Sequence, residues 1–403
     1  MEGVITGLVA GVLLGTISGL LPGIHANTMA GILLGLQATL AGILGEEELA
    51  TAMFAALITH TFLDTIPSTF LGVPDADTAL SVLPSHALCL EGHGEEAVRT
   101  SALGAAWGLS FAIPLSLLCF YLLPPLQPFL DWGIGILLVA VVGTMILAAE
   151  SPRWGAAIFF TSGILGIFTM RYGYLAWHTL GESALLMPLL AGLFGLPALL
   201  YSSHAGIPPQ TFEGISTPLK TIISQSAIGA LAGVLVGWLP GLSTATANGL
   251  LTRFVSYDRD RRGYILATSA ASTSNAFVGL AAFFALGRER SGVIAAMASL
   301  HLPSPLVLAA VGCLAGGAGY LLTVLLAGSA SALQVLDGRT LNYGVAGFVT
   351  LLTLLLSGPF GLLVLLLATL VGIAPYLIDI RKIFCMGAIL LPVILYSFGL
   401  LTL

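Results

Sequence analysis

The sequence has few charged residues. Asp, Glu, Lys and Arg make up 8% of the 403 residues, whereas a soluble globular domain carries about 25%. The 13 Lys and Arg are outnumbered by 19 Asp and Glu, which gives a net charge of -6. The chain therefore lacks a basic surface that could hold a nucleic-acid backbone. These shortages exclude a soluble fold and a nucleic-acid partner.

Cysteine is also scarce, and a cleavable leader is missing. The four cysteines lie far apart and form no C-x-x-C pair or other metal-ligand spacing, so we expect neither a metal site nor a cofactor built on them. The apolar run over residues 3–21 has no basic region before it and no small-residue cleavage site. We interpret this run as a retained helix and not as a signal peptide.

Apolar residues are abundant. The hydrophobic class makes up 57% of the chain, and the mean hydropathy is +1.02. About 20 apolar residues cross a hydrocarbon core of about 30 Å, so the length suits about 10–12 membrane-embedded helices. Some apolar stretches, such as residues 51–63 and 242–254, are too short to span, which predicts half-helices or re-entrant segments. The predicted fold class is an all-α polytopic membrane protein.

The chain divides into two similar halves. Residues 201–219 are polar and rich in Pro and Gly, and we interpret them as a linker between residues 1–200 and 220–403. Five glycine and proline positions recur 218 residues further along. They are Gly11, Gly15, Gly19, Pro22 and Gly23 in the first half and Gly229, Gly233, Gly237, Pro240 and Gly241 in the second. This constant spacing predicts an internal duplication of a transmembrane repeat.

Loop charges indicate how the two repeats are oriented. The sequence Glu46–Glu48 follows the second apolar stretch of the first half, whereas Arg253, Arg259, Arg261 and Arg262 follow its counterpart. Basic loops favour the cytoplasmic side, so these two loops are predicted on opposite sides of the membrane. The two repeats would then be inverted, as is common in secondary transporters.

The repeated Pro-Gly pairs predict helices that break inside the membrane. Backbone groups freed by such a break need protein or a wet cavity as partner, which indicates a substrate or ion site. Small polar residues follow each break, at a helix start that attracts anions, although capping alone is the alternative. The candidate substrate-binding residues are Pro22, Gly23, His25, Asn27, Thr28, Pro240, Gly241, Ser243, Thr244, Thr246, Asn248, Ser274 and Asn275.

Three carboxylates lie among apolar residues in a second polar region, residues 59–78. Intramembrane ionisable groups are expensive to bury and are usually functional. We assign Asp64, with Asp75 and Asp77, to a coupling ion, either Na⁺ or H⁺. The alternative is a set of helix caps in a water-exposed loop, and it applies most to the two carboxylates beside Pro74.

An intramembrane hydrolase and an aqueous channel fit the sequence less well than a transporter. His60 and Asp64 share a helical face and could ligate a metal with His25, as in an intramembrane hydrolase. The sequence contains no H-E-x-x-H motif, nucleophile elbow or phosphate-binding loop, so we expect a transporter and no enzyme. An aqueous channel is disfavoured because paired broken helices are typical of alternating access.

Several of these motifs also match a known family. Residues 15–23, residues 71–74 leading into 90–94, and residues 233–241 followed by 274–276 resemble the large membrane permease of tripartite tricarboxylate transporters, the TctA-like family. The resemblance implies a secondary transporter of the cell membrane that moves carboxylate anions on an ion gradient. It also implies a small membrane subunit and an extracytoplasmic binding protein as partners, and a homodimer is a further arrangement to test.

The chain departs from that family pattern at several points. Leu63-Asp64 stands where the family typically has Gly-Gly, Pro74-Asp75 replaces Pro-Gly, and residues 287–290 replace a Gly-Ile-Pro-Gly. These departures leave the substrate open, and a stand-alone carrier is an alternative. Residues 21–30 are locally similar to the Pro-Gly motif of polyprenyl-phosphate transporters, which gives a lipid-carrier phosphate as the alternative substrate.

Overall fold

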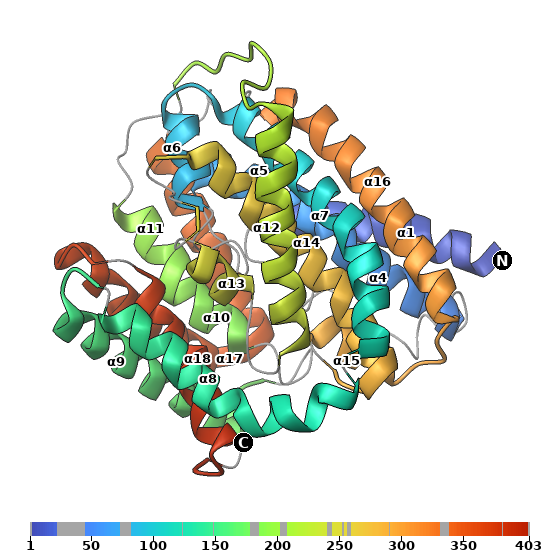
Figure 1. Cartoon of the computed structure of the whole chain (residues 1–403). Coiled ribbons are helices and arrows are strands. Elements are labelled where there is room, and N and C mark those ends of the chain that lie inside the picture. The colour runs from blue at the N-terminus through green and yellow to red at the C-terminus, as the bar shows by residue number, and fades with distance from the viewer. Residues whose placement is uncertain are drawn as a thin grey trace. The chain divides into compact units, whose positions relative to one another are not determined.

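The structure is a computed structural model. It describes residues 2–21, 45–72, 82–122, 124–147, 149–177, 185–201, 208–239, 244–251, 254–255, 259–289, 291–330, 338–380 and 382–401. Every regular element in these ranges is helical (Figure 1), which confirms the all-α prediction. Eight of the described helices are long and apolar enough to cross a membrane, and three shorter apolar helices accompany them. The chain is a polytopic membrane protein.

The chain forms two compact units, and both halves of the sequence contribute to each. Unit 1 comprises Met1–Pro124, His204–Trp238 and Ser243–Asn342, and unit 2 comprises Pro125–Ser203, Leu239–Leu242 and Tyr343–Leu403. Residues 208–218, within the expected linker, have no regular structure. The duplication stays a prediction, and in this grouping each half would supply helices to both units.

Unit 1 is a helical bundle. Its first-half helices are α1 (Glu2–Leu20), α4 (Glu46–Leu63), α5 (Thr65–Leu71), α6 (Val82–Leu90) and α7 (Gly94–Leu122). Its second-half helices are α12 (Leu219–Trp238), α13 (Thr244–Leu251), α14 (Arg261–Leu286), α15 (Gly292–Ala298) and α16 (Pro305–Ala330). The half-helix expected over residues 51–63 is longer than predicted, because α4 continues through α5 as a 26-residue apolar stretch whose residues 49–70 are buried. α13 is short, as expected.

The same packing pattern occurs twice in unit 1. α4 packs against α1 of its own half and α16 of the other half, and α14 packs against α12 of its own half and α7 of the other. The glycine spacing explains the close approach of each first pair, as predicted. A Cβ on Gly15 would lie 2.6 Å from the Ala56 carbonyl oxygen, and one on Gly229 would overlap the Ala267 carbonyl oxygen.

Contacts at the helix ends show how α4 and α14 run. The backbone N–H of His301, which follows α15, donates to Glu46 Oε2 at 2.8 Å in the first turn of α4. At the start of α14, Arg261 lies 2.5 Å from Glu91 Oε1, just beyond α6. The start of α4 therefore lies beside the region that follows α14, and the start of α14 lies beside the region that follows α4. Inverted repeats require this arrangement. The inversion itself stays a prediction.

Unit 2 has the remaining helices. They are α8 (Gln127–Leu147), α9 (Pro152–Arg171), α10 (Leu186–Leu190), a π-helical turn η4 (Ala191–Gly195), α11 (Leu196–Tyr201), most of α17 (Gly338–Leu377), η6 (Lys382–Met386) and α18 (Gly387–Ser397). α17 is 40 residues long, which at 1.5 Å per residue is about twice the hydrocarbon core. Gly358, with φ 67° and ψ -161°, breaks it into two pieces, and it lies between the two apolar runs of the sequence, residues 341–357 and 359–378.

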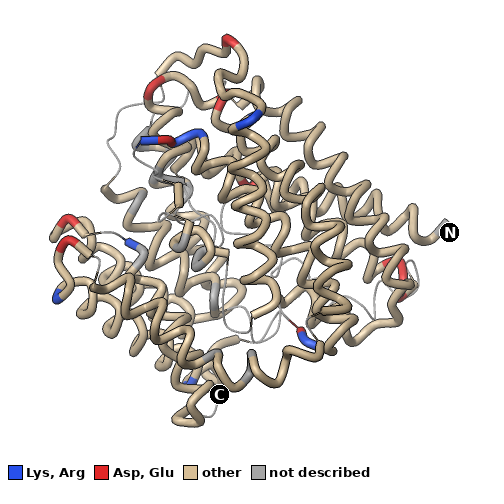
Figure 2. The backbone as a smooth tube through the Cα atoms, in the orientation of Figure 1, with Lys and Arg blue, Asp and Glu red and all other residues tan. Residues whose placement is uncertain are grey.

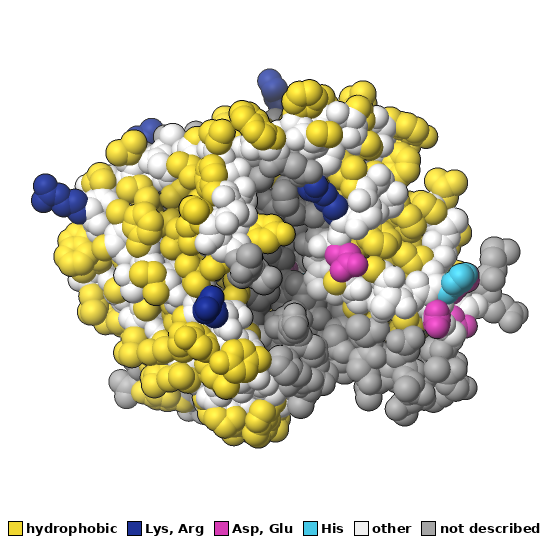
Figure 3. Space-filling model, turned by 90° about the horizontal axis from the view of Figure 1, so that it is seen from below, with side chains coloured by type: hydrophobic (Ala, Val, Ile, Leu, Met, Phe, Trp, Pro, Cys, Tyr) yellow, Lys and Arg dark blue, Asp and Glu magenta, His cyan; other side chains and the backbone are white. Residues whose placement is uncertain are grey.

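Charged groups are few at the surface of the molecule. Figure 2 shows Lys, Arg, Asp and Glu as short coloured segments near helix ends and loops, with long uncharged stretches between them. Hydrophobic side chains cover much of the described surface in Figure 3.

One cation of unit 2, Lys382, contacts a tyrosine. It donates to the Tyr376 hydroxyl, and its Nζ lies 3.9 Å from the centroid of that ring. Burial lowers the pKa of Lys382 to about 8.

Candidate functional site

A polar stripe runs along α4 and α5 in unit 1. Thr61, Asp64, Thr65 and Ser68 are spaced i, i+3, i+4 and i+7, which places them on one helical face. Asp64 stands at the join of the two helices in the αR conformation, and its backbone N–H donates to the His60 carbonyl oxygen at 3.0 Å. Asp64 is only 7% exposed, so it is buried inside unit 1 and does not cap a helix at a water-exposed loop.

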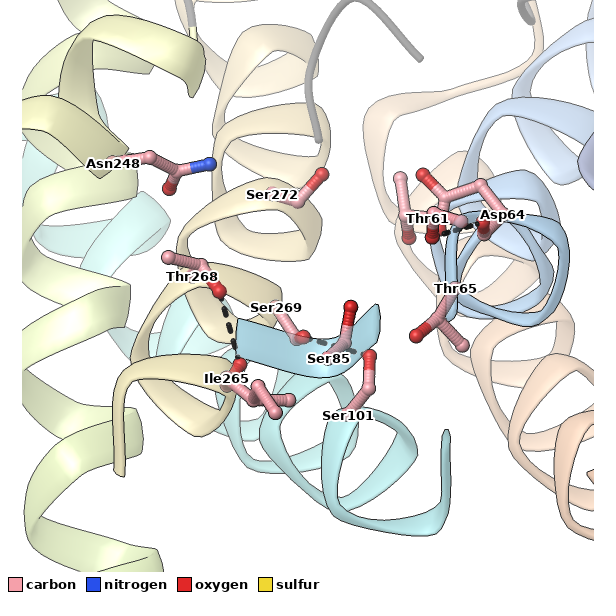
Figure 4. A pocket seen from close by; sticks show the side chains of 11 residues that line it. Thr61, Asp64, Thr65, Ser85, Ser101, Asn248, Ile265, Thr268, Ser269 and Ser272 are labelled. Atoms are coloured by element: carbon pink, nitrogen blue, oxygen red, sulfur yellow. Dashed lines mark hydrogen bonds between the residues drawn. The ribbon is translucent and has the colours of Figure 1, made fainter. Parts of the chain in front are cut away.

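The stripe faces polar side chains from four other helices. Together they line a cavity of about 20 Å³, which we call the hydroxyl cavity. In Figure 4 the labelled side chains of α4 and α5 stand on one side and those of α13 and α14 on the other. The lining residues are Thr61, Asp64, Thr65, Ser68, Ser85, Ser101, Asn248, Ile265, Thr268, Ser269 and Ser272. This volume suffices for one water-sized occupant, which needs about 10–15 Å³.

Several hydroxyl groups of the cavity already donate their protons elsewhere. Ser68 Oγ donates to the Asp64 carbonyl oxygen at 2.7 Å, and Thr268 Oγ1 donates to the Tyr264 carbonyl oxygen at 2.9 Å. Ser101 and Ser269 share a hydrogen bond of 2.7 Å, which uses the proton of one of them. A hydroxyl that has donated its proton can offer only lone pairs to another group. The cavity, with its carboxylate, is therefore rich in acceptors.

The structure brings some predicted residues together. Asp64 and Asn248 line the same cavity, although they lie far apart in the sequence. Asn275 Nδ2 donates to Thr244 Oγ1 at 3.0 Å, which joins α14 to α13. Ser274 does not line the cavity, because its hydroxyl donates to the carbonyl oxygens of Ala230 and Ala271, each at 3.2 Å. The predicted roles of these residues as ligands of a substrate or a coupling ion stay predictions.

The other predicted site residues lie outside what the structure describes. Thr246 belongs to α13, but its side chain is not among those described. The remaining predicted residues outside the described ranges are Pro22, Gly23, His25, Asn27, Thr28, Asp75, Asp77, Pro240, Gly241 and Ser243. Their assignments to substrate or coupling ion stay predictions.

Sequence reasoning missed part of the cavity. Ser85, Ser101 and Ser269 come from helices whose apolar neighbours gave no sign that they meet. The stripe on α4 and α5 carried a detectable signal, because polar residues at i, i+3, i+4 and i+7 inside an apolar stretch define one wet or liganded face. A search for polar helical periodicity would have found its hydroxyl residues together with Asp64.

His60 contacts another helix inside unit 1. Its ring is buried on α4, and its Nδ1 lies 3.0 Å from Ser18 Oγ on α1. Within the described ranges, no group of three or more His, Cys, Asp or Glu side chains could hold a metal ion.

A partly buried ion pair joins the two halves at one end of unit 1. Arg262 on α14 donates to both carboxylate oxygens of Glu96 on α7, at 2.8 and 2.7 Å. The backbone N–H and the hydroxyl of Ser216, in the irregular segment before α12, donate to Glu96 Oε1 at 3.1 and 2.6 Å. The segment between the halves is therefore fixed to both of them.

The comparison with known families decides what kind of protein this is. The model of the tripartite tricarboxylate transporter TctA family matches residues 5–387. The chain belongs to this family. With eight apolar helices of spanning length in its described part, this TctA-family chain is a multi-pass membrane protein.

One relative and the solved structures complete the comparison. An uncharacterized protein of Methanocaldococcus jannaschii is 32% identical to this TctA-family chain over 254 residues, which cover 62% of each protein. The matched part thus spans about three fifths of that relative. No solved structure matches the chain.

Proposed function

We propose that this chain is a secondary active permease of the cell membrane that moves a carboxylate anion, such as a tricarboxylate or dicarboxylate. A cation gradient would drive the transport, and no chemical reaction would be catalysed. The observation that carries the proposal is the TctA family match over residues 5–387. The apolar helices and the buried carboxylate Asp64 support it, because intramembrane ionisable groups are typical of ion pathways.

The anion and the cation would occupy different places. We propose that the anion binds at the predicted Pro-Gly breaks, where the helix N-termini expected from the sequence would present backbone N–H groups and partial positive charge. The hydroxyl cavity is a poor anion site because it is small and contains the carboxylate of Asp64. Asp64 would instead carry the coupling cation, as the sequence predicts.

The proposal includes partners and an alternating-access fold. The family's tripartite description supports a small membrane subunit and an extracytoplasmic binding protein as partners. The antiparallel course of α4 and α14 supports inverted repeats, the arrangement in which two halves exchange inward and outward access around a central site.

Ligand-induced stabilisation of the detergent-purified protein tests the substrate class. A ligand that binds only the folded state raises apparent stability by mass action. Citrate, smaller di- and tricarboxylates and a short polyprenyl phosphate would each be added with and without Na⁺. Stabilisation by a carboxylate would support the proposal. Stabilisation by the polyprenyl phosphate alone would replace the substrate with a lipid carrier, and no stabilisation by any carboxylate would count against the proposal.

A further inference from the structure

We propose that the hydroxyl cavity binds one dehydrated monovalent cation, for which Na⁺ is the probe. Asp64 would supply the charge, and the hydroxyl oxygens of Thr61, Thr65, Ser68 and Ser272 would supply the other ligands. This inference rests on the proposed function, whose coupling ion it identifies. Asp64 is also a departure from the family's usual Gly-Gly pair, so the site would be a property of this chain and not of the family pattern.

The charge of the cavity selects a monovalent ion. Among its described lining residues, Asp64 alone is ionisable at neutral pH, and the others are hydroxyl residues, Asn248 and Ile265. One monovalent cation neutralises this single carboxylate. A divalent cation would leave a net positive charge inside an apolar bundle, where an uncompensated charge is costly.

The ligand chemistry selects a hard cation. Carboxylate, hydroxyl and amide oxygens suit hard ions and not the softer transition metals. Thr61 and Ser68 donate their protons to the carbonyl oxygens of Ile58 and Asp64, so their lone pairs remain for a cation. A proton carried by Asp64 would need only that carboxylate and would give no role to hydroxyl oxygens contributed by α4, α5 and α14.

The size of the cavity excludes larger occupants. About 20 Å³ holds one water-sized body, which excludes a hydrated ion and a di- or tricarboxylate. A cation that enters must leave its hydration shell, and the surrounding oxygens can replace it. A dehydrated alkali cation is no larger than a water molecule, so the cavity can hold one such ion.

The site also connects the two halves of the sequence. Thr61, Asp64, Thr65 and Ser68 belong to α4 and α5 in the first half, and Ser272 belongs to α14 in the second. An ion held by both sides would stabilise their contact. Ion binding can thereby change how readily the two sides separate during transport.

Direct measurement of Na⁺ binding, without any anionic substrate, tests the site. Full-length protein in detergent would be melted in NaCl, LiCl, KCl and choline chloride at equal ionic strength, and ²²Na⁺ binding would be measured by equilibrium dialysis. We expect stabilisation that grows with the concentration of Na⁺ or another alkali cation, with little effect of choline. Asp64→Asn should abolish it, and Ser272→Ala should weaken Na⁺ binding by about 10-fold or more, as loss of a neutral group that supports a metal site typically does.

Ser162→Ala is the matched control. Ser162 is fully buried on α9 in unit 2, where its hydroxyl donates to carbonyl oxygens of Phe159 and Phe384, and it does not line the cavity. This variant removes a buried hydroxyl but should bind Na⁺ as the wild type does. If Asp64→Asn fails to fold, Ser272→Ala and Thr65→Val decide the question, since each removes an uncharged ligand.

Each outcome separates this inference from the permease proposal. Equal melting curves in NaCl and choline chloride, or a full Na⁺ response in Asp64→Asn, would overturn the cation site. A response to pH that is the same with and without Na⁺ would replace Na⁺ with a proton. Carboxylate binding without a Na⁺ response would support the permease proposal and overturn the cation site. Na⁺ binding without carboxylate binding would support the cation site and count against the permease proposal.

Discussion

Loss of the partly buried Arg262–Glu96 ion pair should destabilise the protein more than loss of its neighbour, Arg261–Glu91. The Glu96 side chain is 6% exposed and that of Arg262 31%, whereas the side chains of Arg261 and Glu91 are 35% and 52% exposed. Two adjacent arginines therefore provide a matched comparison. Arg262→Gln leaves a buried carboxylate that retains only its hydrogen bonds from Ser216.

The expected magnitudes follow from this difference in burial. Breaking a fully buried pair costs about 3–5 kcal/mol, and a hydrogen bond to a charged group contributes about 1.5–3 kcal/mol. Because Arg262 is partly exposed, we expect about 2–3 kcal/mol for Arg262→Gln after allowance for solvent screening. Arg261→Gln should cost less than about 1 kcal/mol, the usual value for an exposed pair.

Equilibrium unfolding in mixed detergent micelles would measure both variants. Salt supplies a second readout, since raising ionic strength from about 0.01 M to about 1 M shortens the screening length from about 30 Å to about 3 Å. The small effect of Arg261→Gln should disappear in high salt, and most of the Arg262→Gln effect should persist. Equal losses of stability in the two variants, or equal salt dependence, would refute the reasoning.

Three further predictions use other parts of the molecule. Gly229→Ala should cost about 1–3 kcal/mol, because the new methyl group meets the Ala267 carbonyl oxygen, and equilibrium unfolding would show it. Gly317→Ala has open space in α16 and should gain about 0.5–1 kcal/mol in the same assay. Lys382 loses its proton near pH 8 when folded but only near about 10.4 when unfolded, so the unfolded state binds more protons between these values and stability should rise with pH there. Unfolding free energies at both ends of this range should show a smaller rise in Lys382→Met.

Much of the fold follows from simple features of the sequence. Low charge and long apolar runs predict membrane helices, and the glycine repeat predicts which face of α1 and α12 approaches another helix. Gly15 and Gly229 do so because a side chain there would meet a neighbouring carbonyl oxygen. Helix length was harder to predict, since the polar residues around Asp64 suggest a helix end, whereas burial of their hydrogen bonds lets α4 continue into α5.

The candidate site was predictable only in part. Asp64 could be identified because an ionisable residue in an apolar stretch is unusual. Ser85, Ser101 and Ser269 could not, because each is a common small residue whose significance depends on which helices meet. Ser274 shows the converse, since a polar residue beside a candidate ligand bonds to the backbone of a neighbouring helix. Tertiary packing, and not local pattern, makes these distinctions.

Uptake of a tricarboxylate into proteoliposomes tests the central claim most directly. Wild type, Asp64→Asn and the Ser162→Ala control would be compared with an inward Na⁺ gradient, with equal Na⁺ on both sides, and with choline in place of Na⁺. We expect gradient-driven accumulation by the wild type and the control, and none by a folded Asp64→Asn protein. Gradient-driven accumulation that persists unchanged in Asp64→Asn would contradict it.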